Sequence, residues 1–203
     1  MSRVEAIFGH QFGGAAAAEK YQMASLVETP VNKDVLAVAR AFKSSSPRPN
    51  LYISGPTGCG KTHVATAMIQ DVQGRVLKPY QILRAARAVM AVDGMTEGDV
   101  TGVFLGRKLW TPEMFLPPVS DFALDDLGTE KLTEWAESIL FELFDSRLSY
   151  GMGGMVVTSN LSLDELAGRM GSDRVPSRIA GAFKVFNLSG EKDYRVCSPG
   201  GAR

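Results

Sequence analysis

The sequence predicts an α/β fold in which a parallel β-sheet is covered by helices. Short apolar runs that suit buried strands alternate along the chain with segments whose apolar residues recur at helical spacing, and this alternation is typical of parallel sheets. A glycine-rich loop, from Gly55 to Thr62, lies between one such run and one such helix. Strand, loop and helix in that order form the context of a phosphate-binding P-loop.

Residues 1–28 are expected to form an arm with little core of its own, because glycine and alanine mix there with scattered polar groups. Residues 29–203 then form the α/β domain. Helical spacing of apolar residues begins at Asn32 and stops at a serine-rich stretch before Pro47. A capping-box sequence predicts a further short helix from Ser162. Strands are expected at residues 51–53, 75–78, 122–124, 155–158 and 183–188.

Composition is that of an ordinary globular protein with a packed core. The 203 residues carry 22 Lys and Arg against 22 Asp and Glu, so capture of a polyanion would need a local basic patch rather than bulk charge. A disulfide from Cys59 would obstruct the glycine-rich loop, which favours a reducing compartment. Because no signal core or spanning segment of about 18 apolar residues is visible, the sequence predicts a cytoplasmic protein without a membrane contact.

The glycine-rich loop predicts an ATP site with Mg²⁺. Its glycines let backbone N–H groups turn toward phosphates, Lys61 supplies a positive charge, and the Thr62 hydroxyl can ligate the metal. His63 follows Thr62 in the sequence and is expected to lie on the helix surface rather than to act in catalysis. A GTPase is less favoured, because Asn32-Lys33-Asp34 lacks the Asn-Lys-x-Asp spacing and lies before the loop. The candidate nucleotide-binding residues here are Gly55, Pro56, Thr57, Gly58, Cys59, Gly60, Lys61, Thr62 and His63.

Polar side chains are expected at the carboxyl ends of two further strands, where open α/β sheets bind their ligands. Asp125 would hold Mg²⁺ directly or through water, and Asp126 would orient or activate the attacking water. Two acids at a turn can also simply cap a helix. Asn160 follows the next strand and could contact the γ-phosphate or the water, although asparagine also commonly terminates strands.

Two arginines, Arg174 and Arg178, lie four residues apart and would share a helical face. One hypothesis is a solvated basic surface. The other is that one of them is an arginine finger that reaches the ATP of a neighbouring subunit.

Basic and aromatic residues in the middle of the chain suggest contact with single-stranded DNA. Arg84 and Arg87 share a helical face, and Arg107 and Lys108 lie close to Trp110. Such clusters are also common on solvated surfaces.

The chain resembles the DnaC/IstB group of AAA+ ATPases, which comprises replicative helicase loaders of bacteria and phages and transposition helper ATPases. The similarity covers about residues 29–195. Besides the P-loop, the matching stretches are residues 124–131 running on to Glu134-Trp135, residues 156–162, Ser177-Arg178-Ile179 and Asp193-Tyr194-Arg195.

This resemblance implies an AAA+ core with a five-stranded parallel sheet, assembly side by side, and ATP at subunit junctions. It also implies Arg178 as the finger and Arg195 near the sensor-2 position. A DnaB-type replicative helicase and single-stranded DNA would be the partners of a loader. The short arm departs from the family's usual N-terminal helicase-binding domain and weakens the helicase assignment.

Three other functions stay open at this stage. A transposition helper of the same family would bind duplex DNA and a transposase. A small-molecule kinase also uses a P-loop on a parallel sheet, but the match around Asp125 and Arg178 argues against it. A module that holds ATP without turnover would release no phosphate.

Overall fold

The computed structural model describes residues 21–91, 121–129, 133–151 and 153–190. At its centre is a sheet of five strands, with each neighbouring pair parallel and the order β2-β3-β4-β1-β5. The fold class that the sequence predicts is therefore confirmed. The strands are β1 (Leu51–Ser54), β2 (Arg75–Leu77), β3 (Phe122–Leu127), β4 (Met155–Ser159) and β5 (Lys184–Asn187).

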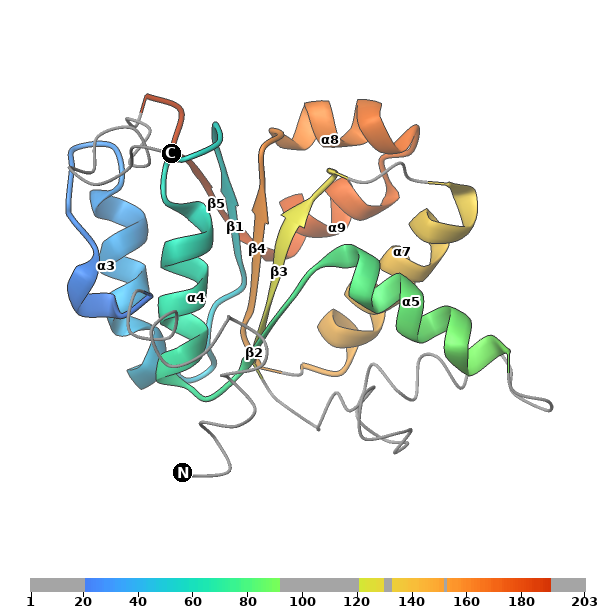
Figure 1. Ribbon diagram of the computed structural model, residues 1–203, viewed down its shortest axis with the longest axis horizontal. Helices are drawn as coiled ribbons and strands as arrows, with labels where there is room; N and C mark the ends of the chain where they lie inside the picture. The colour runs from blue at the N-terminus through green and yellow to red at the C-terminus, as the bar shows by residue number, and fades with distance from the viewer. Residues whose placement is uncertain (1–20, 92–120, 130–132, 152, 191–203) are drawn as a thin grey trace, which may run out of the picture.

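Helices cover both faces of this sheet (Figure 1). On one face lie α3 (Lys33–Ala41) and α4 (Lys61–Asp71), and on the other lie α5 (Pro79–Met90), α7 (Glu134–Ser149) and α9 (Arg174–Ala182). Two single-turn 3₁₀ helices, η1 (Met23–Ser25) and η2 (Phe42–Ser44), flank α3 in the chain. The short α8 (Leu163–Met170) follows β4 at the carboxyl end of the sheet.

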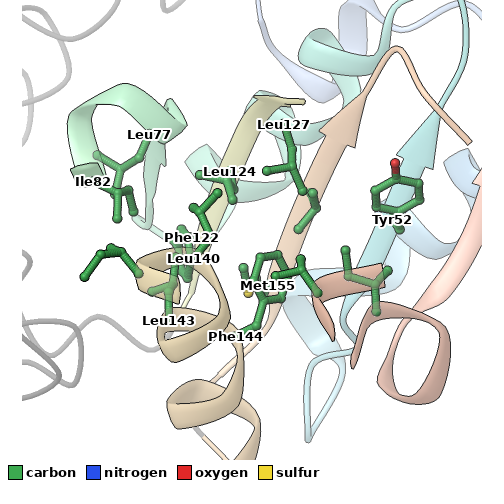
Figure 2. Close-up of a cluster of buried hydrophobic side chains, with 14 of the residues drawn as sticks. Tyr52, Leu77, Ile82, Phe122, Leu124, Leu127, Leu140, Leu143, Phe144 and Met155 are labelled. Atoms are coloured by element: carbon green, nitrogen blue, oxygen red, sulfur yellow. The ribbon is translucent and has the colours of Figure 1, made fainter. Parts of the chain in front are cut away.

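Alternation along the strands divides the core into two clusters. Leu51 and Ile53 of β1 pack with α3 and α4, whereas Tyr52 between them packs on the other side. Figure 2 shows that second cluster, in which Phe144 and other α7 side chains meet the sheet. The Tyr52 hydroxyl donates a hydrogen bond to the Leu161 carbonyl (2.7 Å), and burial raises the pKa of Tyr52 to about 12. This bond ties β1 to the loop after β4.

Local sequence signals explain where α8 begins and ends. The Ser162 hydroxyl accepts from the Glu165 N–H while the Glu165 carboxylate accepts from the Ser162 N–H, as the capping box predicts. These bonds lower the pKa of Glu165. Gly171, with φ 68°, ends the helix in the left-handed conformation that glycine adopts without strain.

Strand β3 is longer than the sequence predicts. It runs through both acids to Leu127, and its register with β4 shifts between Leu124 and Leu127. In the sequence, the two acids Asp125 and Asp126 end an apolar run, which predicts that the strand ends there. A β-bulge lets the strand continue past them.

The described part of the arm, residues 21–28, lies against the domain. Met23 and Leu26 are partly buried on the cluster beneath α3 and α4. Among the helices that the structure describes, none is long and apolar enough to cross a membrane.

Candidate nucleotide-binding site

The P-loop connects β1 to α4, as the sequence predicts, and its glycines adopt positive φ angles that strain other residues. Gly60 is the N-cap of α4 with φ 93°, and Gly55 has φ 150°. A Cβ on Gly55 would lie 3.1 Å from Cys59 Sγ and from the backbone of Leu188. Because Gly60 has no side chain to cap the helix, the first N–H groups of α4 are left for an anionic ligand.

Lys61 is held inside this loop with only 5% of its surface exposed. Its Nζ donates to the carbonyl oxygens of Gly55 (2.8 Å) and Pro56 (2.7 Å) and lies 3.7 Å from Cys59 Sγ. Within the described ranges, no carboxylate pairs with this ammonium group. A buried cation without a counter-charge fits a phosphate as its missing partner.

Asp125 connects the P-loop to the two neighbouring strands. Its Oδ1 accepts hydrogen bonds from Thr62 Oγ1 (2.8 Å) and Thr158 Oγ1 (2.7 Å), and the residue is 3% exposed. Carboxylate and hydroxyl oxygens are the ligands that Mg²⁺ prefers. No cluster of three His, Cys, Asp or Glu side chains that could hold a metal by itself occurs in the described part of the chain. Thr62 and Asp125 could each supply an oxygen ligand to Mg²⁺, with phosphate oxygens as further ligands.

Asp126 lies at the β3 bulge with φ 64°, which is unusual for a residue other than glycine. Its N–H donates to Thr158 Oγ1 (2.9 Å), so that one threonine hydroxyl contacts both acids. The Asp126 carboxylate forms an ion pair with Lys78 Nζ (2.9 Å), which follows β2, and this hydrogen bond raises the pKa of Lys78. Sequence reasoning missed Lys78, because only the pairing of β2 with β3 brings it to the site.

Two other predicted site residues lie beside this centre. Asn160 is exposed and comes directly after β4, whose last residue, Ser159, is in register with Leu127 of β3. His63 contacts the arm instead, because its Nε2 is 2.9 Å from Ser25 Oγ and its ring meets the Tyr21 ring edge-on at 5.4 Å between centroids. Arg195 lies outside the described residues.

The two candidate finger arginines share α9, and Pro176 lies within its first turn. Arg174 pairs with Glu137 (3.6 Å) and Arg178 with Asp145 (2.5 Å), both of α7. The predicted common face is thus observed, although both guanidinium groups are held by acids that the sequence analysis did not single out.

The basic residues suggested for DNA are only partly described. Arg84 and Arg87 are exposed on α5, and the Arg87 guanidinium lies 4.8 Å from the centre of a Trp135 ring. Arg107, Lys108 and Trp110 lie outside the described residues.

The parallel sheet carries a P-loop after β1, two acids near the carboxyl end of β3 and polar residues at the end of β4. Together these features define a P-loop nucleotide-binding protein. The model of the IstB-like ATP binding protein family matches residues 33–180. The chain belongs to this family, and the resemblance that the sequence predicts is confirmed.

Relatives by sequence agree with that assignment. The chain is 29% identical over 151 residues to the ATP-binding protein ascribed to insertion sequence IS5376 of Geobacillus stearothermophilus, which is 72% of this chain and 55% of the relative. It is 36% identical over 63 residues to the replication factor C small subunit of Sulfurisphaera tokodaii, or 31% of this chain and 19% of that protein. The chain therefore spans only about a fifth to about half of the curated relatives it matches.

Solved structures share the fold. The DnaC helicase loader superposes with a TM-score of 0.66 at 20% identity, over 85% of this chain and 99% of that one. DnaA from Aquifex aeolicus bound to AMPPCP gives a TM-score of 0.64 at 20% identity, over 83% of this chain and 50% of that one. DnaI gives 0.60 at 14% identity, over 82% of this chain and 89% of that one.

Proposed function

We propose that this protein is a Mg²⁺-dependent ATPase whose nucleotide state controls its assembly on DNA. The observation that carries the proposal is the joint contact of Asp125 Oδ1 with the hydroxyls of Thr62 and Thr158. It holds a buried carboxylate against the first turn of the P-loop helix, through the residue that follows Lys61 in the sequence. A bound Mg²⁺ would neutralise charge on the β- and γ-phosphates.

The chain's own residues supply the remaining parts of hydrolysis. Lys61 and the first N–H groups of α4 bind phosphate oxygens, and Thr62 and Asp125 present oxygen ligands. Asp126 orients the attacking water and takes its proton, for which its carboxylate must turn from Lys78 toward the phosphates. Asn160, at the end of β4, contributes an amide to the same edge.

We further propose that the site is completed by Arg178 of a neighbouring subunit. Within its own subunit Arg178 lies on α9 and pairs with α7 rather than with the P-loop. An arginine that acts in trans is worth about 10³ to 10⁵ in rate in other nucleotide hydrolases.

A mixing experiment tests this arrangement. Arg178→Ala retains its P-loop and Lys61→Ala retains its arginine, so each variant alone should be inactive and a mixture should regain activity at mixed junctions. No recovery despite co-assembly would mean that Arg178 acts in its own subunit or only structurally.

For the biological role we propose a replicative helicase loader that binds single-stranded DNA. The superposition on nearly the whole of the solved DnaC loader chain supports this role. A DnaA structure bound to AMPPCP and single-stranded DNA also shares the fold. The expected result is phosphate release stimulated by single-stranded DNA, and retention of a purified DnaB-type hexamer in the presence of ATP.

A second candidate is a transposition helper, favoured by the IstB-like family match and by the IS5376 relative. In that case duplex DNA should stimulate phosphate release, and a transposase should be retained in place of the helicase. If the protein releases no phosphate with either kind of DNA, it is a module that binds ATP without hydrolysing it, and the ATPase proposal is contradicted.

A further inference from the structure

The two arginines of α9 lie over a single aromatic ring of α7. The guanidinium carbon of Arg174 is 4.0 Å from the ring centre of Phe141, and that of Arg178 is 5.5 Å away. Both line a groove of about 630 Å³ between the two helices. The four-residue spacing on α9 and the shared aromatic ring therefore hold the two positive charges side by side at the groove.

The acids that hold these arginines differ in their surroundings. The Glu137 side chain is 11% exposed and also accepts a hydrogen bond from Ser172 Oγ (3.0 Å), so it is fixed from two directions. The Asp145 side chain is 34% exposed, whereas the two arginines are equally open, at 48% for Arg178 and 50% for Arg174, so the pairs differ in the burial of the acid. An ion pair so open to water is weak, whereas a buried acid keeps its partner.

We propose that Asp145 is a positioning residue that stores Arg178 on Phe141 in the isolated subunit and competes with an incoming nucleotide for it. Arg174, stacked more closely and paired with the more buried Glu137, stays in place and supports the groove. The inference rests on the proposed function, in which Arg178 acts on a neighbour's ATP. The greater exposure of Asp145 than of Glu137 is what favours Arg178 over Arg174 as the arginine that leaves its acid.

The expected effect of removing the Asp145 charge follows from the solvent exposure of the Asp145–Arg178 ion pair. Exposed ion pairs contribute at most about five-fold to an equilibrium. Asp145→Asn removes the competing charge and keeps the side chain's shape, so the variant should reach half-maximal ATPase at about two- to five-fold lower protein concentration. The rate at saturating protein should not change, because Arg178 has left Asp145 in the assembled state.

The test compares ATPase rate against protein concentration for the parent, Asp145→Asn, Asp145→Glu, Arg178→Ala and the double variant Asp145→Asn with Arg178→Ala. Sedimentation in the presence of AMPPCP measures assembly independently of turnover. Asp145→Asn should assemble at lower concentration, Asp145→Glu should retain the parent's behaviour, and the double variant should match Arg178→Ala. Glu137→Gln is the matched control, which removes the charge of the acid that pairs with Arg174 and should give no gain. Thermal melting verifies that each variant is folded.

Two results would overturn the proposal. If Asp145→Asn changes neither the ATPase rate nor the assembly as a function of protein concentration, the ion pair does not restrain Arg178. If it loses activity at saturating protein as Arg178→Ala does, Asp145 orients the arginine in the assembled state instead of storing it. A different result would contradict the role of Arg178 as the arginine finger. If Arg178→Ala hydrolyses ATP like the parent, Arg178 is not the finger, and Asp145 then has no finger to store.

Discussion

Thr158 offers the sharpest test of the site, because its hydroxyl contacts both acids of β3. It donates to Asp125 Oδ1 (2.7 Å) and accepts from the Asp126 N–H (2.9 Å), and the residue is fully buried. Thr158→Val keeps the shape of the side chain and deletes both bonds. We expect the protein to be less stable and to bind Mg²⁺-ATP more weakly, since Asp125 then relies on Thr62 alone.

The magnitude follows from the two bonds. A hydrogen bond to a charged group contributes about 1.5–3 kcal/mol and one to a neutral amide about 0.5–1.5 kcal/mol. Their loss should lower the free energy of unfolding by roughly 2–4.5 kcal/mol. Thr158→Ser is the matched control, because it retains the hydroxyl and loses one methyl group worth about 1 kcal/mol.

Urea denaturation followed by circular dichroism measures the stability of both variants, and calorimetry with Mg²⁺-ATP measures their affinity for nucleotide. The order of stability should be parent, Thr158→Ser, Thr158→Val. Equal midpoints for the two variants would refute the reasoning, because the hydroxyl would then not hold the acids.

Three further predictions concern other residues of the fold and site. Lys61→Ala should abolish productive ATP binding, because the loop loses its one buried cation; unchanged affinity and turnover in calorimetry and phosphate release would contradict this. Asp126→Asn should leave ATP bound but slow hydrolysis, and a parallel fall in binding would instead identify Asp126 as a metal ligand or structural acid. Tyr52→Phe should be less stable than the parent near neutral pH by about 1 kcal/mol, for one lost hydrogen bond. Because the folded-state pKa of Tyr52 is raised to about 12, the parent should lose stability relative to the variant as pH rises from about 10 to 12, by up to about 3 kcal/mol. The denaturation curves of the two proteins should therefore converge or cross in this range.

Sequence patterns predicted the parts of the fold that depend on neighbours along the chain. The strand before Gly55, the helix after it and the capping box at Ser162 are each written in a few consecutive residues, and all are observed. The partners of the functional side chains come from distant segments. Lys78 meets Asp126 only because β2 pairs with β3, and Asp145 meets Arg178 only because α7 packs on α9. No local pattern encodes such contacts.

The left-handed backbone of Asp126 restricts which side chains the position accepts. Asp and Asn adopt φ near 64° at little energetic expense, whereas longer or branched residues are strained there. The backbone at the bulge therefore favours the shorter of the two natural acids at this point, independently of the reaction. Glutamate at this position would keep the negative charge but would be strained at this backbone φ. Alanine would lose the carboxylate and would also be strained. Asparagine is thus the substitution that separates the chemistry of this carboxylate from the conformation of the chain beneath it.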